Sequence, residues 1–196
     1  MLELIQNLDK TLFYFVNNGL SNPFFDKLMP FVTEVNSWVL VYLVGFYFLF
    51  FKSGRKGKIV AITLIITIII TDQINSHIIK ELVGRIRPCH SLPDVNLLVG
   101  CGGGKSFPSS HAANNFAAAY VITYFFRKNY FLFFSIASIV AISRVYVGVH
   151  YPIDIFVGAL VGILIAYIVS ASVRLIFDKY KILNRTENKN SSINLK

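Results

Sequence analysis

The sequence predicts an all-α fold: an integral membrane helical bundle of about five transmembrane helices plus an N-terminal interfacial helix. Hydrophobic residues form 55% of the 196-residue chain and the mean hydropathy is +0.59, values typical of membrane proteins. Several apolar runs approach the roughly 20 residues that a helix needs to cross a bilayer. Basic residues gather in short turns between these runs, so the net charge of +9 indicates membrane topology and no nucleic-acid partner.

Residues 1–30 are expected to form an amphipathic segment in the membrane interface. Apolar side chains recur at helical spacing between residues 4 and 16, which fits an interfacial helix and equally a surface helix packed on the bundle. The acidic start of the chain does not resemble a signal peptide. The polar run 17–23 breaks the segment, although a sixth, irregular crossing is the alternative to five spans.

Residues 31–178 are expected to form the transmembrane bundle. Five spans are predicted from the apolar runs: one from about Pro30 to Phe51, then Ile59–Ile79, Ala112–Phe126, Tyr130–Ile142 and Asp154–Phe177. A long polar loop, residues 80–107, separates the second span from the third. The polar tail, residues 179–196, is expected to be disordered and cytoplasmic.

The basic turns give one consistent orientation. If the turn 52–58 faces the cytoplasm, Arg127, Lys128 and the basic tail fall on the same face. The loop 80–107 and the turn between the last two spans then lie on the extracytoplasmic face.

Three polar clusters interrupt the apolar sequence on that outer face, and a bilayer excludes such groups unless they have a function. They span residues 80–88, 108–111 and 143–154. Lys80, Arg87 and Arg144 offer a point charge and two planar forks for the oxygens of one anion. A doubly charged phosphate fits this set best, and snorkelling of the cations to the interface is the simpler alternative.

The other polar residues suit phosphoryl transfer. Ser109 and Ser110 stand at the start of a helix, where they can cap it or donate to a phosphate. His111 follows them and can protonate a leaving oxygen. His150 and Asp154 are four residues apart, so a carboxylate can fix the imidazole tautomer and leave the other nitrogen free to attack phosphorus. A purely structural His–Asp pair is the alternative.

The outer loop contains three further candidates. Arg85 lies two residues from Arg87, so on a helix it points elsewhere and can contact a lipid headgroup. Cys89 and Cys101 are expected to form a disulfide in this oxidising compartment, with two free thiols as the alternative. Zinc binding by the cysteines and His90 is disfavoured because the four-ligand pattern is incomplete.

The three clusters resemble the signature of the type 2 phosphatidic-acid phosphatase family. The matching elements are Lys80-x6-Arg87-Pro88, Pro108-Ser109-Ser110-His111 and Ser143-Arg144-x5-His150-x3-Asp154. The resemblance implies that His150 is the nucleophile, that Asp154 supports it and that His111 is the general acid. It assigns phosphate contacts to Lys80, Arg87, Ser109 and Arg144. Ser110 stands where the family usually has Gly, so its backbone amide can donate but its side chain limits close approach.

The resemblance also implies a function: an integral-membrane lipid phosphatase that forms a phosphohistidine and needs no metal or cofactor. The expected location is the bacterial inner membrane, with the active site facing the periplasm. Its expected partners are a lipid phosphate substrate and membrane lipids, with no obligate protein partner. Candidate substrates are undecaprenyl pyrophosphate, the 1-phosphate of lipid A, phosphatidylglycerol phosphate and phosphatidic acid. A transporter or a non-catalytic binder of phosphorylated lipids is the alternative.

Overall fold

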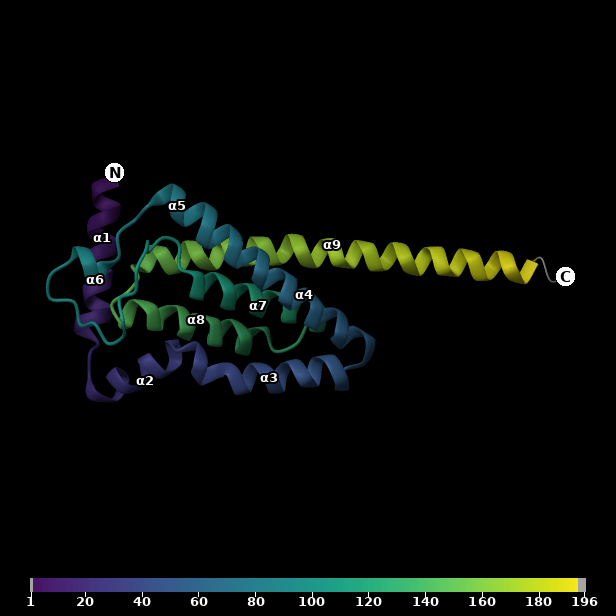
Figure 1. Ribbon diagram of the computed structural model, residues 1–196, viewed down its shortest axis with the longest axis horizontal. Helices are drawn as coiled ribbons and strands as arrows, with labels where there is room; N and C mark the ends of the chain where they lie inside the picture. Colours follow the sequence, from purple (N-terminus) through teal and green to yellow (C-terminus); the bar gives the residue numbers. More distant parts are fainter. Residues whose placement is uncertain (1, 194–196) are drawn as a thin grey trace.

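A computed structural model describes residues 2–193 of the chain, and the side chains of residues 3–179 (Figure 1). This part of the chain is helical and contains no strand. Its α-helices are α1 (Leu2–Tyr14), α2 (Pro23–Thr33), α3 (Val39–Tyr47), α4 (Gly54–Gln73), α5 (Lys80–Val83), α6 (Pro88–Ser91), α7 (Ser110–Phe126), α8 (Tyr130–Tyr146) and α9 (Pro152–Ile193). A π-helical turn, Ile74–Ile79, joins α4 to α5 without a break.

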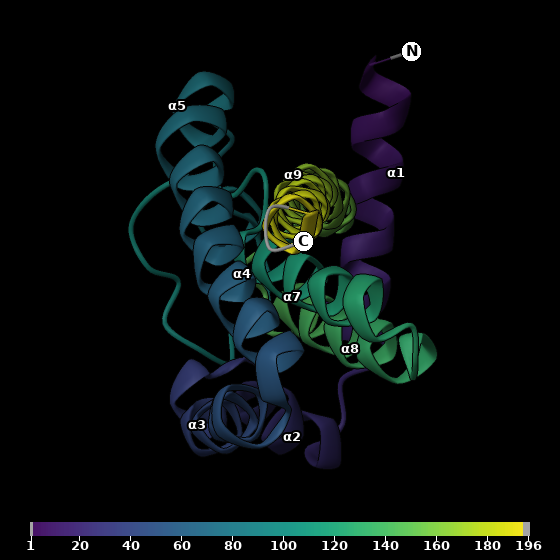
Figure 2. The same cartoon turned by 90° about the vertical axis from the view of Figure 1, so that its right-hand side faces the viewer.

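Five helices form the membrane bundle, which confirms the predicted fold class. The stretches around α3, α4 and α9 are long and apolar enough to cross a membrane. The helices α7 and α8 are shorter, with 17 residues each. All five run along the long axis of the molecule, whereas α1 lies across one end of the bundle in both views (Figures 1 and 2).

Two predicted boundaries shift. The first span begins at Val35, because Glu34 adopts an extended backbone, and Pro30 lies inside α2. The polar loop begins at Gly84, whose left-handed backbone ends α5, so Lys80 belongs to the helical rod and not to the loop.

The last helix extends into the region that was predicted to be a polar tail. Helix α9 continues to Ile193, and the tail up to that residue contains neither proline nor glycine to end it. Residues 194–196 lie outside the described part of the chain.

Glycines allow α7 and α9 to pack with their backbones in contact. A Cβ atom on Gly158 would lie 2.5 Å from the carbonyl oxygen of Ser109, and one on Gly162 would lie 2.0 Å from that of Ala113. Small residues four apart permit such close approach in membrane helices. The contact brings together the first turns of α7 and α9, where the Ser109 amide donates to the Asp154 carbonyl oxygen at 2.9 Å.

The N-terminal segment packs against both the polar loop and the bundle. The buried side chains are Asp9 and Phe13 on α1 and Asn17 in the π-helical turn Phe15–Gly19 that follows it, while Leu4 and Leu8 on other faces of α1 are exposed. The Asn17 amide group donates to the backbone oxygens of residues 96 and 146 at 2.8 and 2.6 Å, and its oxygen accepts from the amide of residue 96. The segment therefore combines an apolar outer surface with specific packing on the bundle.

We expect Gly162→Ala to lower the free energy of unfolding by about 2 kcal/mol, because the added methyl group would overlap a backbone oxygen of α7. Gly45→Ala on α3 is the matched control: nothing lies within 4 Å of the position that its added methyl group would take, so higher helix propensity should leave stability equal or slightly higher. Unfolding in detergent, monitored by circular dichroism, measures both. Equal stability of the two variants would contradict the close α7–α9 contact.

Candidate active site

His150 and Asp154 face one another at the turn between α8 and α9. The His150 side chain is 2% exposed, and its Nδ1 lies 3.5 Å from Oδ2 of the fully buried Asp154. The turn is closed by the amides of Val149 and His150, which both donate to the carbonyl oxygen of Arg144 at 3.2 Å. The Tyr151 amide also donates to Asp154 Oδ2 at 2.9 Å. The carboxylate is therefore held beside the imidazole by the first turn of α9.

His150 lies in this turn, outside the membrane-spanning helices, and burial lowers its pKa to about 4. The Asp154 carboxylate opposes this shift, while the charges of Arg144 and Arg87 add to it. The imidazole is consequently neutral near pH 7 and keeps an unprotonated nitrogen. With Nδ1 toward Asp154, that nitrogen is Nε2, which lies 3.5 Å from a guanidinium nitrogen of Arg87.

The three predicted cations come from three different parts of the chain. Lys80 lies on α5, Arg87 just before α6 and Arg144 in the last turn of α8. One guanidinium nitrogen of Arg87 donates to the Val149 carbonyl oxygen at 3.3 Å, and one of Arg144 donates to the Thr33 hydroxyl at 2.6 Å. Their Nε atoms are buried and have no hydrogen-bond partner among the described residues. Both arginines are thus anchored but keep N–H groups for an anion.

The second cluster forms the N-terminus of α7. The Ser109 hydroxyl caps the helix by accepting from the Ala112 amide at 3.5 Å, and the half-buried His111 lies in the first turn. The Ser110 hydroxyl accepts from Lys80 Nζ at 2.9 Å. The side chain that replaces the usual Gly therefore positions one of the three cations.

Asn75 and Ser76 complete this arrangement and were not predicted as site residues. The Asn75 amide donates to the Ser110 hydroxyl at 2.9 Å, and the Ser76 hydroxyl lies 3.2 Å from the same atom. Both belong to the π-helical turn below Lys80. The signal for them was a group of polar side chains at the end of an apolar span.

Arg85 lies outside the cation cluster, as its position in the sequence predicts, but its partners are carboxylates. One guanidinium nitrogen contacts Asp154 Oδ1 at 2.7 Å and another contacts Asp9 Oδ2 at 2.6 Å. Its guanidinium carbon also lies 3.8 Å from the centre of the Tyr151 ring. These contacts occupy the fork that was expected to meet a lipid headgroup. Asp9 was missed because its partners are 76 and 144 residues away.

One protein family matches more than half of the chain. The PAP2 superfamily aligns with residues 58–178, which include all three polar clusters. The chain belongs to the PAP2 superfamily.

Relatives and solved structures of the superfamily cover most of the chain. It is 34% identical to the lipid A 4'-phosphatase of Bacteroides thetaiotaomicron over 170 residues, 83% of this chain and 75% of the relative. It is 30% identical to that of Porphyromonas gingivalis over 176 residues, 86% of this chain and 74% of the relative.

Two crystal structures share the fold. Aquifex aeolicus LpxE aligns with a TM-score of 0.66 and 27% identity, over 83% of this chain and 94% of LpxE. The PAP2-type phosphatidylglycerolphosphate phosphatase of Bacillus subtilis aligns with a TM-score of 0.67 and 23% identity, over 90% of this chain and 87% of that one.

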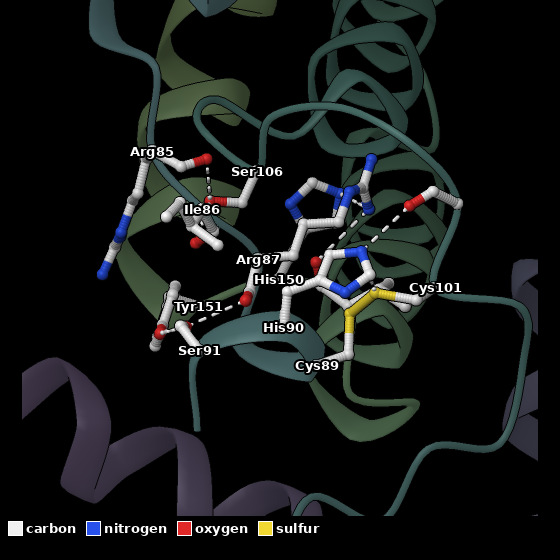
Figure 3. The surroundings of a disulfide bond; sticks show 12 residues. Arg85, Ile86, Arg87, Cys89, His90, Ser91, Cys101, Ser106, His150 and Tyr151 are labelled. Atoms are coloured by element: carbon white, nitrogen blue, oxygen red, sulfur yellow. Dashed lines mark hydrogen bonds between the residues drawn. A yellow bond between two sulfur atoms is a disulfide. The ribbon is translucent and has the colours of Figure 1, made fainter. Parts of the chain in front are cut away.

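A disulfide closes the loop of this PAP2 protein beside the candidate active site. It joins Cys89 in α6 to Cys101 (Figure 3). His90 Nε2 lies 3.1 Å from the Cys101 sulfur, so these three residues form a cluster that could bind a metal by position alone. Because both sulfurs are bonded to one another, no thiolate remains to bind zinc. Figure 3 shows Arg87 and His150 close to this disulfide.

We expect reduction of this disulfide to destabilise the protein by about 3 kcal/mol, since it frees a short loop. The measurement is the unfolding midpoint in detergent with and without dithiothreitol. A variant with both Cys89→Ser and Cys101→Ser should unfold at the same midpoint as the reduced parent protein, and dithiothreitol should not change that midpoint. A midpoint that dithiothreitol does not change in the parent protein, with two titratable thiols present before reduction, would contradict the disulfide.

Proposed function

We propose that this PAP2 membrane protein is a lipid phosphatase that transfers a terminal phosphate to His150 and then to water. The observation that carries the proposal is the neutral, buried imidazole: Nδ1 faces Asp154, and Nε2 lies beside Arg87. A nucleophile, an orienting carboxylate and a cation are thus assembled at one end of the bundle.

In the first step, Nε2 of His150 attacks phosphorus, an N–P bond forms and the bond to the lipid oxygen breaks. Asp154 stabilises the positive charge that develops on the imidazole. Lys80, Arg87 and Arg144 neutralise the phosphoryl oxygens, a role that fixed cations fill in phosphoryl transfer without changing their protonation. The imidazolium form of His111 donates its proton to the leaving lipid oxygen and becomes neutral.

In the second step, water attacks the phosphohistidine. His111, now unprotonated, accepts a proton from that water, the N–P bond breaks and phosphate leaves. Both imidazoles return to their starting states. Because the three cations supply the charge neutralisation, we propose that the reaction needs no metal.

The substrate we propose is a lipid A phosphate. The two relatives named above are lipid A 4'-phosphatases, and LpxE shares the fold at 27% identity. The three polar clusters suit a phosphate and carry no signal for the lipid tail, so undecaprenyl pyrophosphate is the second substrate to test. We place the site on the periplasmic face of the inner membrane, since the basic turns at Lys56 and Arg127 lie at the opposite end of the bundle.

The four histidines of the chain provide a matched test. Phosphate release is measured from purified protein with EDTA, using lipid A phosphates, undecaprenyl pyrophosphate, phosphatidylglycerol phosphate and phosphatidic acid. His150→Ala and His111→Ala should each lower kcat by about a hundredfold or more, because each removes a group that takes part in bond making or proton transfer. His77→Ala and His90→Ala should retain activity. Equal release by His150→Ala and the parent would contradict the nucleophile, and binding without release would favour a transporter or a silent binder.

The pH profile tests the neutral imidazole. Because burial lowers the pKa of His150 to about 4, its unprotonated form persists down to about pH 5. We measure kcat/KM against pH and divide it by the fraction of substrate whose phosphate is fully ionised, which phosphorus NMR gives. On the acidic side, where protonation of His150 would remove the nucleophile, we expect this corrected value to fall below about pH 5 and not above it. A histidine with its ordinary pKa of about 6.5 would instead cause a tenfold loss by about pH 5.5, and that result would contradict the buried nucleophile.

A further inference from the structure

We propose that Asp9 and Arg85 are positioning residues for the proposed phosphatase reaction, acting on His150 through Asp154. The inference rests on the proposed function and extends the active site to the N-terminal helix. The three side chains form a continuous line of charge from α1 to the catalytic turn.

Arg85 is the centre of this line. Its two terminal nitrogens each contact a different carboxylate, Asp9 at 2.6 Å and Asp154 at 2.7 Å. Both carboxylates are fully buried, whereas the Arg85 side chain is 23% exposed. The guanidinium also lies over the Tyr151 ring at 3.8 Å, and Figure 3 shows it directed away from His150 and Arg87. Arg85 therefore holds the far side of the Asp154 carboxylate instead of binding phosphate.

The contact between Arg85 and Asp154 determines which carboxylate oxygen faces the His150 imidazole. Oδ1 is taken by Arg85, while Oδ2 accepts from the Tyr151 amide and faces His150 Nδ1. The planar fork of arginine restrains the carboxylate more strongly than a point charge does. Loss of Arg85 would remove the restraint on Oδ1 and leave the buried carboxylate without a fixed positive charge beside it.

Asp9 sets the charge of the line. With Asp9 present, two carboxylates and one guanidinium give a net charge of −1, so Asp154 keeps a negative potential toward His150. Without the Asp9 charge, Arg85 would balance Asp154 alone and weaken the stabilisation of a positively charged imidazole. Burial makes such interactions stronger than they are in water.

A purely mechanical role for Asp9 is the competing explanation. Its Oδ1 accepts from the Ile153 amide at 2.9 Å, so Asp9 also fastens α1 to the first turn of α9. Asn17, however, already fastens the same N-terminal segment to residues 96 and 146 without contacting the line of charge. Asn17→Ala thus reports the loss of fastening alone, and a change of charge at Asp9 can be separated from it.

The test uses Asp9→Asn in the full-length protein, which removes the charge and keeps an oxygen for the Ile153 amide. We expect kcat to fall about tenfold, equivalent to about 1.4 kcal/mol, with KM within twofold, because the phosphate contacts are untouched. Single-turnover formation of the phosphoenzyme should slow by the same factor. Glu3→Gln, an exposed carboxylate on the same helix, should match the parent, and Asn17→Ala should lower the unfolding midpoint but not kcat.

A double-mutant cycle shows whether Asp9 acts through Arg85. In an Arg85→Gln background, Asp9→Asn should change kcat by less than twofold, since the coupling partner is gone. If Arg85→Gln does not fold, Asp9→Asn alone tests the inference: a lower kcat with an unchanged KM supports a positioning role for Asp9. The inference fails if Asp9→Asn leaves kcat unchanged, if its effect is the same in both backgrounds, or if Asn17→Ala reproduces it. An active His150→Ala protein would instead overturn the proposed function itself.

Discussion

The backbone contact between α7 and α9 is the constraint on which the site depends. Because Gly158 and Gly162 have no side chains, α9 lies so close to α7 that a Cβ atom at either position would overlap the α7 backbone. The Ser109 amide can therefore reach the Asp154 carbonyl oxygen. This single approach joins the second polar cluster to the third. The first cluster then completes the site from α5 and the loop, where Lys80 reaches Ser110 and Arg87 reaches Val149. Three segments distant in sequence thus meet at one end of the bundle.

The charges are arranged in two groups on either side of His150. Lys80, Arg87 and Arg144 lie on the side proposed for phosphate, while the line of Asp9, Arg85 and Asp154 lies behind the imidazole. Isolated charges are costly to bury, and each buried carboxylate here contacts Arg85 and a backbone amide. The arrangement provides positive charge where an anion would bind and a net negative charge where a cation would form.

Much of the fold and the proposed site could be predicted from the sequence because the signals are local. Apolar runs predict the helices, and the spacing of His150 and Asp154 predicts their pairing. Asp9 and Asn75 could not be assigned, since a polar residue in an apolar helix does not reveal a partner 76 or 35 residues away. Proline favours a helix start, which suggests that a span begins at Pro30, whereas the structure tolerates this residue in the second half of α2.

If the site faces the periplasm, as proposed, the disulfide links the loop beside it to the direction in which the chain is inserted. Cysteines oxidise outside the reducing cytoplasm, and the bond between Cys89 and Cys101 closes the loop that follows Arg87. A copy inserted in the opposite direction would keep two thiols and an open loop. In the proposed orientation, this bond would therefore form only after the loop has been exported to the periplasm.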